Sequence, residues 1–166
     1  EWAKLHSGLL KAFPGNLVTV VDYTRDNSKL LFYVHADRNP GEYYVLDRAT
    51  NKVQLINQTM PWIKPASLAS TMPISFTTRD GLTLHGFYTA PATPGPKPMI
   101  VMPHGGPHGP YDTWGYDSDA QFLASRGYGV LQVNYRGSGG RGKKFEESGY
   151  REWGGKMQDD LADGVK

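Results

Sequence analysis

The chain has 166 residues, of which 39% are hydrophobic and 20% are charged, as in a folded globular protein. Its 18 basic and 16 acidic residues give a formal net charge of +2, which argues against a nucleic-acid partner. The absence of cysteine excludes disulfide bonds and cysteine-ligated zinc, but it leaves the cellular compartment open. No apolar run reaches the roughly 18 residues that a membrane span needs.

Both ends of the sequence have the character of a fragment. The chain begins Glu-Trp-Ala-Lys, with neither an initiator methionine nor a signal peptide. It ends at residues 159–166 inside a helical pattern that has no convincing stop. We therefore expect a piece of a longer protein.

Residues 1–60 are expected to form a four-stranded antiparallel β-meander. Four short runs rich in Val, Tyr, Phe and Leu are separated by turn-forming residues, and they cover 17–24, 29–36, 42–48 and 52–58. Such a meander is the unit of a β-propeller blade, and alone it would leave both faces exposed. We interpret it as the last blade of a propeller; a small free-standing sheet is the alternative.

Residues 61–72 contain two prolines and small polar residues, and we expect a linker there. From residue 73 onward a second domain is predicted. Residues 73–91 alternate apolar and polar around Asp80–Gly81, which is a strong signal for a β-hairpin.

The rest of the chain predicts an α/β layer whose sheet becomes parallel. Two apolar runs, 99–102 and 128–135, are expected as strands, the first of them buried on both faces. Residues 118–127 predict a helix that Gly127 ends. Ser118 or Asp117 is its expected N-cap, and Phe122 and Leu123 are its expected apolar positions. A second, amphipathic helix is predicted further along the chain, with apolar residues at Trp153, Met157, Leu161 and Val165.

The segment VMPHGGPHGP, residues 101–110, follows a predicted strand directly. Ligand sites of open α/β sheets gather at the carboxyl ends of strands. Gly105 and Gly106 allow unusual backbone conformations and leave an amide N–H uncovered, while Pro107 stiffens the turn. A preorganised N–H of this kind stabilises the oxyanion of acyl transfer, contributing about 2.7–4 kcal/mol. For the tetrapeptide His-Gly-Gly-Pro taken alone, a simple Gly-Pro turn with an incidental histidine is the better interpretation.

Two other chemistries can be tested against the same residues. His104 and His108 share one face only in a helix, and the Gly-Gly-Pro between them disfavours both that helix and a metal site. Gly137, Gly139 and Gly142 match G-x-G-x-x-G after a strand, which taken alone suggests a dinucleotide site. The preceding strand is the second of its sheet, and the acidic pair 159–160 falls on a helix, so we expect no cofactor.

No serine of this chain can be the nucleophile of a hydrolase elbow. None of the nine serines has glycine at both −2 and +2, so the G-x-S-x-G pattern is missing. Ser138 lies in the glycine-rich loop and is interpreted as a turn residue.

Taken in order, three motifs resemble the prolyl oligopeptidase family of serine peptidases, in particular its acylaminoacyl-peptidase and dipeptidyl-peptidase-like branch. They are PISFTTRDGLTLHGFYTAP, MPHGGPHG and VNYRGSGGRGKKFEESGYREWGGKMQDDLADGV, which together cover residues 73–166. The resemblance extends more loosely to residues 39–56, as a last propeller blade. It implies that residues 73–166 are the N-terminal half of an α/β-hydrolase domain.

The same resemblance implies roles for individual residues. Gly106 would supply the first oxyanion-hole N–H, and His104 would shape the loop in the place where other branches carry a tyrosine. Residues 134–137, Asn-Tyr-Arg-Gly, would form a second loop at the rim of the active site, with a structural or binding role. The triad would arrive in the order Ser, Asp, His, beyond Lys166.

The resulting hypothesis is a fragment of a serine peptidase that acts on oligopeptides and is inactive by itself. The preferred residue at the cleavage site and the oligomeric state of the complete protein stay open. A non-peptidase esterase or amidase is one alternative, because the same half-domain serves both. A non-catalytic binding module that kept the fold is the other.

Overall fold

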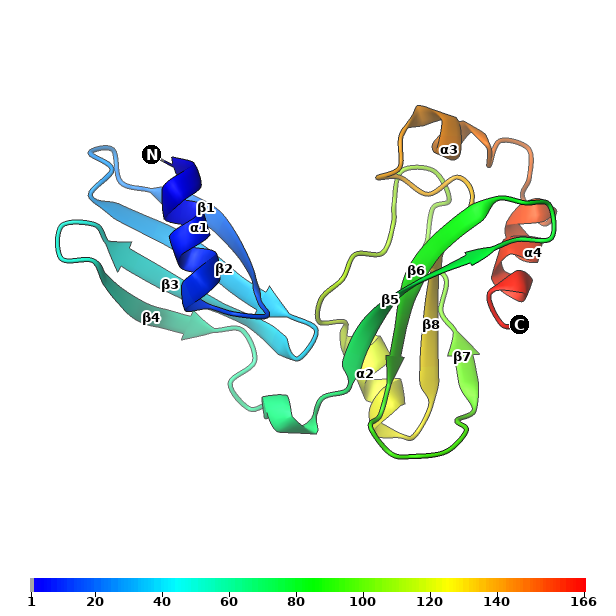
Figure 1. Ribbon diagram of the computed structural model, residues 1–166, viewed down its shortest axis with the longest axis horizontal. Helices are drawn as coiled ribbons and strands as arrows, with labels where there is room; N and C mark the ends of the chain where they lie inside the picture. The colour runs from blue at the N-terminus through cyan, green and yellow to red at the C-terminus, as the bar shows by residue number, and fades with distance from the viewer. Residues whose placement is uncertain (1) are drawn as a thin grey trace. The chain divides into compact units, whose positions relative to one another are not determined.

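The computed structural model describes residues 2–166, which divide into two compact units. The first unit contains the residues up to Leu68 and residues 115–117, and the second contains 69–114 and 118–166. Each unit has its own hydrophobic core and its own four-stranded sheet (Figure 1). None of the helices within residues 2–166 is long and apolar enough to cross a bilayer.

The first unit is an antiparallel meander with one helix. The strands pair in chain order, β1-β2-β3-β4, and all three pairings are antiparallel, which confirms the predicted meander. The elements are α1 (Trp2–Ala12), β1 (Leu17–Tyr23), β2 (Lys29–Ala36), β3 (Asn39–Asp47) and β4 (Lys52–Gln58), followed by a short 3₁₀ turn, η1 (Pro65–Ser67).

Strand β2 shows why this segment folds as a strand. Alternate residues Leu30, Phe32 and Val34 are fully buried, as a two-residue period requires when one face meets a core. The second hairpin is tighter than expected, because Ala36 pairs with Asn39 and the strand therefore begins three residues before Glu42.

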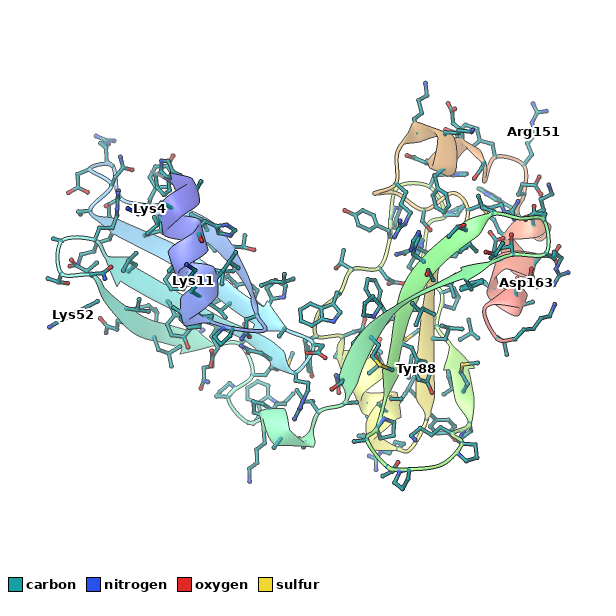
Figure 2. The ribbon with its side chains drawn as sticks, viewed as in Figure 1. Lys4, Lys11, Lys52, Tyr88, Arg151 and Asp163 are labelled. Atoms are coloured by element: carbon teal, nitrogen blue, oxygen red, sulfur yellow. The ribbon has the colours of Figure 1, made fainter. Side chains whose placement is uncertain are left out.

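Helix α1 is an element that the sequence prediction missed, since the whole N-terminal region was expected to be β. It buries Leu9 in the core of the first unit, with Leu5 and Phe13 packed beside it, so one helical face meets the sheet. Lys4 and Lys11, labelled in Figure 2, are exposed. Pro14 and Gly15, with φ +76° at the glycine, end the helix.

The second unit is built around a mixed sheet of order β5-β6-β8-β7. Pairings β5–β6 and β6–β8 are antiparallel and β7–β8 is parallel, which confirms the predicted change to a parallel arrangement. The elements are β5 (Ser70–Thr77), β6 (Thr83–Ala90), β7 (Met99–Val101), α2 (Ser118–Ser125), β8 (Gly129–Asn134), α3 (Lys143–Glu147) and α4 (Lys156–Asp163). Strand β5 thus begins at Ser70, inside the segment expected as a linker.

Position in the sheet decides how deeply its strands are buried. Every residue of β8 is buried, because β8 lies between β6 and β7. The prediction that 99–102 is buried on both faces is wrong: β7 ends the strand order, and Met99 is 38% exposed. The predicted hairpin is confirmed, with Gly81 at φ +86° and its N–H bonded to the Thr78 carbonyl.

Both predicted helices of this unit form, but in each helix the buried residues differ from the predicted apolar positions. Helix α2 leaves Phe122 58% exposed and buries Ala120 and Ala124 instead. Helix α4 buries Met157 with Leu161 packed beside it, whereas Trp153 and Val165 lie outside the helix and are exposed. The short α4 therefore meets the core through a single pair of residues four apart.

Candidate active site

The glycine-rich loop follows β7 at the carboxyl end of that strand. The N–H of Met102 still bonds to the Leu131 carbonyl at 2.8 Å, and from Pro103 the chain leaves the sheet. Gly106 has φ +131°, and a Cβ there would lie 3.2 Å from the Pro110 ring. Glycine is thus required at 106. A Cβ on Gly105 would meet nothing within 4 Å.

Two glycines of this loop leave their amide N–H groups without a hydrogen bond among the described residues. Gly105 and Gly106 are exposed, and within residues 2–166 neither N–H makes a hydrogen bond to the protein. Exposed N–H groups on a fixed loop can bind an anionic oxygen. This is the chemistry that the family resemblance implies for Gly106.

His104 is fixed on several sides. Its Nδ1 lies 2.9 Å from the Gly105 carbonyl oxygen, and its Nε2 lies 2.7 Å from Oγ of Ser138. Its ring stacks on the ring of Tyr135, with centroids 4.5 Å apart and an interplanar angle of 13°. The His104 side chain therefore faces the second loop and the loop backbone.

The second loop, which begins at the last residue of β8 and covers residues 134–140, also contacts the glycine-rich loop beyond His104. The Tyr135 hydroxyl donates to the His104 carbonyl at 2.8 Å, and the Gly139 N–H donates to the Pro110 carbonyl at 3.1 Å. The Asn134 side chain bonds to both backbone groups of Asp112, at 2.7 and 2.9 Å. Burial and the charge of Asp112 raise the pKa of Tyr135, so its hydroxyl stays protonated.

The glycines that match G-x-G-x-x-G serve this packing. A Cβ on Gly139 would lie 2.1 Å from the Gly109 carbonyl oxygen, and one on Gly137 would lie 2.7 Å from Met157. Helix α3, which follows Gly142, has only five residues. Contacts within the protein thus explain Gly137 and Gly139 without a nucleotide.

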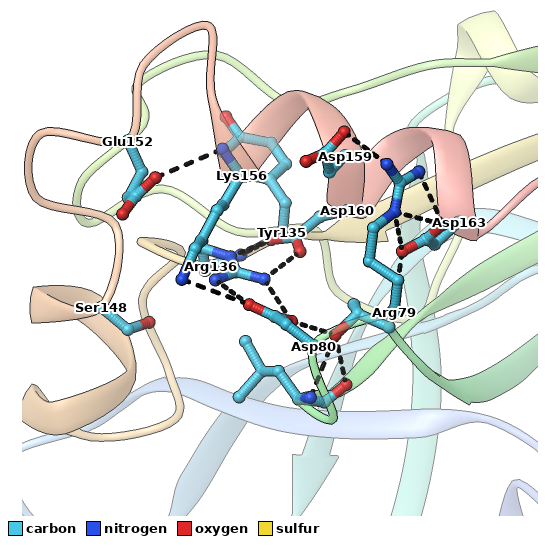
Figure 3. A network of polar contacts seen from close by, with 12 residues as sticks. Arg79, Asp80, Tyr135, Arg136, Ser148, Glu152, Lys156, Asp159, Asp160 and Asp163 are labelled. Atoms are coloured by element: carbon cyan, nitrogen blue, oxygen red, sulfur yellow. Dashed lines mark hydrogen bonds and ion pairs between the residues drawn. The ribbon is translucent and has the colours of Figure 1, made fainter.

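Arg136 anchors the second loop to helix α4 and to the β5–β6 hairpin (Figure 3). Its guanidinium forms ion pairs with Asp160 at 2.7 Å and with Asp80 at 2.9 Å, and its backbone N–H also donates to Asp160. The side chains of Arg136 and Asp160 are 6% and 0% exposed. Hydrogen bonds to Asp160 and Asp80 raise the pKa of Arg136, and the bond from Arg136, with help from Thr78, holds the pKa of Asp80 well below its ordinary value.

A second arginine continues this network toward the end of α4 (Figure 3). Arg79 pairs with Asp163 and Asp159, each at 2.9 Å, and its hydrogen bonds hold the pKa of Asp163 well below the ordinary range. Asp159–Asp160 was noted in the sequence only as evidence against a nucleotide. The structure shows that both residues bind arginines from distant segments.

His108, the other histidine of the motif, has different surroundings from His104. Its ring meets Tyr150 edge-on, with centroids 4.8 Å apart, and lies 6.3 Å from the ring of Trp153. Its Nδ1 is buried without a hydrogen-bond partner among the described residues. No group of three or more His, Cys, Asp or Glu side chains within residues 2–166 is arranged to hold a metal ion.

A cavity of about 360 Å³ opens beside the glycine-rich loop. Its walls come from that loop, from Tyr135 just after β8, from the turn before α4 and from α4 itself, and they include His104, Gly106, Tyr135, Trp153, Met157 and Leu161. Gly105 and Gly106, whose N–H groups are unbonded, therefore border the same cavity as a largely apolar wall.

Ser138 is the residue whose importance the sequence did not show. It is fully buried, and its hydroxyl donates to the Tyr135 carbonyl at 2.6 Å while facing His104. The turn interpretation is correct but incomplete, because the contact with His104 joins residues 34 positions apart. Only the proximity of both segments to strand ends could have suggested it.

A mixed sheet with a glycine-rich loop at the carboxyl end of a parallel strand places the second unit among α/β proteins. Within that class, residues 114–166 match the model of the "Prolyl oligopeptidase family". The resemblance found in the sequence is confirmed: residues 114–166 match this family, and the similar proteins named below are called peptidases.

Similar proteins match over most of the chain. "Dipeptidyl aminopeptidase BIII" of Pseudoxanthomonas mexicana is 36% identical over 92% of this chain and 23% of its own length. "Dipeptidyl peptidase family member 6" of Caenorhabditis elegans is 31% identical over 95% and 24%. The acylaminoacyl peptidase structure of Pyrococcus horikoshii superimposes with a TM-score of 0.67 at 26% identity, over 88% of this chain and 23% of that one. The chain therefore spans about a quarter of the length of these relatives.

Proposed function

We propose that this chain is part of a serine peptidase and that it supplies the first half of the oxyanion hole. In this proposal residues 1–60 are a blade of a β-propeller and 73–166 the N-terminal part of an α/β-hydrolase domain. Residues 61–72 connect the two, and the last three of them already belong to strand β5. The observation that carries the proposal is the glycine-rich loop: it follows a parallel strand, requires glycine at 106 and leaves exposed amides beside a cavity.

The reaction assigned to the complete protein is hydrolysis of a peptide bond. A serine attacks the peptide carbonyl, and the carbonyl oxygen acquires negative charge in the tetrahedral intermediate. The Gly106 N–H and the amide after the serine donate to that oxygen, while His104 keeps the loop in shape. The Ser, Asp and His of the triad come from outside the 166 residues, so this chain alone is inactive.

Oligopeptides are the proposed substrates. The relatives named above are called a dipeptidyl aminopeptidase, a dipeptidyl peptidase family member and an acylaminoacyl peptidase, and these names point to peptides as substrates. A propeller blade in the first unit agrees with this class, because a propeller can restrict access to peptides of limited size.

The test compares the complete protein, including the residues encoded after Lys166, with the 166-residue chain. We expect the complete protein to hydrolyse a dipeptidyl or acetyl-aminoacyl 4-nitroanilide and to be labelled by a serine-reactive fluorophosphonate. The 166-residue chain should do neither. Hydrolysis of a 4-nitrophenyl ester without any amide hydrolysis would favour an esterase, and no labelling or turnover at all would favour a binding module.

A further inference from the structure

The two adjacent glycines of the loop have little means of holding their own conformation. Gly105 and Gly106 contribute no side chain, and within residues 2–166 their N–H groups make no hydrogen bonds to the protein. Two adjacent glycines have the largest backbone entropy to lose on ordering. The loop geometry must therefore be imposed by its neighbours, through His104 on one side and Pro110 on the other.

Ser138 makes the contact that fixes the His104 ring. Its Oγ lies 2.7 Å from His104 Nε2 and 2.6 Å from the Tyr135 carbonyl oxygen. Since Ser138 has no exposed surface, water cannot replace either contact. The stacked Tyr135 ring prevents His104 from tilting, and Ser138 prevents it from turning within its plane.

The segment that carries Ser138 is itself immobilised. Arg136, two residues earlier, binds Asp160 through its guanidinium and its backbone N–H, and the carboxylate is fully buried. Beyond Ser138, the Gly139 N–H bonds to Pro110. Ser138 thus lies between two fixed points, one in helix α4 and one at the far end of the glycine-rich loop.

We propose that Ser138 is a positioning residue of the oxyanion hole: through His104 it holds the loop so that the Gly106 N–H points at the reacting oxygen. The proposal rests on the proposed function of Gly106. A donor contributes to the rate only when it is aimed in advance, so a loosened loop lowers kcat. Ser138 does not bind the substrate, so KM stays the same.

Ser148 provides a matched control. Its hydroxyl also donates to the carbonyl three residues earlier, that of Phe145, at 2.6 Å. Among residues 2–166, however, the Ser148 hydroxyl makes no hydrogen bond to a histidine. Replacing each serine by alanine therefore removes the same local hydrogen bond, and only Ser138→Ala also removes the contact with His104.

The experiment uses the complete protein. For Ser138→Ala we expect kcat for a peptidyl 4-nitroanilide to fall about 10–100-fold with KM unchanged. The loop exchange is read at two protected amides, that of Gly139, which bonds to Pro110, and that of Asp112, which bonds to Asn134; both should exchange with deuterium faster than in the wild type. Ser148→Ala should change neither readout. Combined with His104→Ala, Ser138→Ala should add no further loss of kcat, because both variants break one contact.

Each outcome decides a separate question. An active wild type whose kcat and loop exchange are unaffected by Ser138→Ala overturns the positioning role and leaves the peptidase function intact. A wild type without peptidase activity overturns the proposed function, and the exchange comparison of Ser138→Ala with Ser148→Ala still decides whether Ser138 holds the loop. If Ser138→Ala does not fold, His104→Ala takes its place, because it removes the same contact, and unchanged loop exchange in that variant contradicts the proposal.

Discussion

At the scale of single residues, the two adjacent glycines of the loop are not equivalent. Gly106 has φ +131°, a region that L side chains rarely adopt, and its Cβ position is crowded by Pro110. Gly105 has open space at its Cβ position and no positive φ. The backbone geometry therefore assigns the strict requirement for glycine to 106, the same residue that the family resemblance assigns to the oxyanion.

Gly106→Ala should damage catalysis far more than Gly105→Ala. The added methyl group strains the backbone and displaces the N–H from the oxyanion, so in the complete protein kcat should fall by about 10²–10³-fold. Gly105→Ala should stay within a few-fold of the wild type. Steady-state kinetics with a peptidyl 4-nitroanilide measure both, and equal losses in the two variants would contradict the assignment of the donor to Gly106.

At the scale of elements, the β5–β6 hairpin, the second loop and helix α4 meet at Arg136 (Figure 3). The hairpin contributes Asp80 and the helix contributes Asp160, so one buried guanidinium joins three segments. A buried ion pair gains little relative to an apolar contact, but removing one member leaves an uncompensated charge. The network therefore fixes how these elements meet more than it adds to stability.

Asp160→Asn and Asp159→Asn compare a buried with an exposed carboxylate on the same helix. Loss of the Asp160 charge leaves Arg136 underpaired and should lower the free energy of unfolding by about 3–5 kcal/mol. Asp159 and its partner Arg79 are both about half exposed, so Asp159→Asn should cost about 0–1 kcal/mol. Urea unfolding monitored by circular dichroism gives both values, and similar midpoints for the two variants would refute the buried-anchor role.

At the scale of the whole molecule, the sequence predicted the features that short-range patterns encode. Alternation at Leu30, Phe32 and Val34 defines β2, and Asp80–Gly81 defines the β5–β6 hairpin. Helix α1 was missed because a short helix is stabilised by the sheet it covers rather than by its own residues. The contact of Ser138 with His104 and the arginine networks join segments 24 to 84 positions apart, so only tertiary structure reveals them.

Both units contain groups whose pKa values make folding sensitive to acid. Burial lowers the pKa of His35 in the first unit, and burial followed by the charge of Arg141 lowers that of His85 in the second. Hydrogen bonds from Thr24 and Ser28 lower the pKa of Asp26 to about 2. In each case the unfolded chain takes up a proton at a higher pH than the folded chain does.

Stability should therefore fall as the pH is lowered, in two steps. A group with a lowered folded-state pKa stabilises the fold above its unfolded pKa, and this contribution is lost as pH falls toward the folded value. The contribution of the histidines is lost below about pH 6.5 and that of the carboxylates below about pH 4.

Thermal midpoints of the wild type, His35→Gln and His85→Gln, measured from pH 7.5 to 3, separate the two steps. Each variant should lose part of the decline between pH 6.5 and 5 while keeping the decline below pH 4, because the carboxylates that cause the lower step are untouched. A variant whose midpoint runs parallel to that of the wild type through the upper step would show that its histidine does not titrate with unfolding.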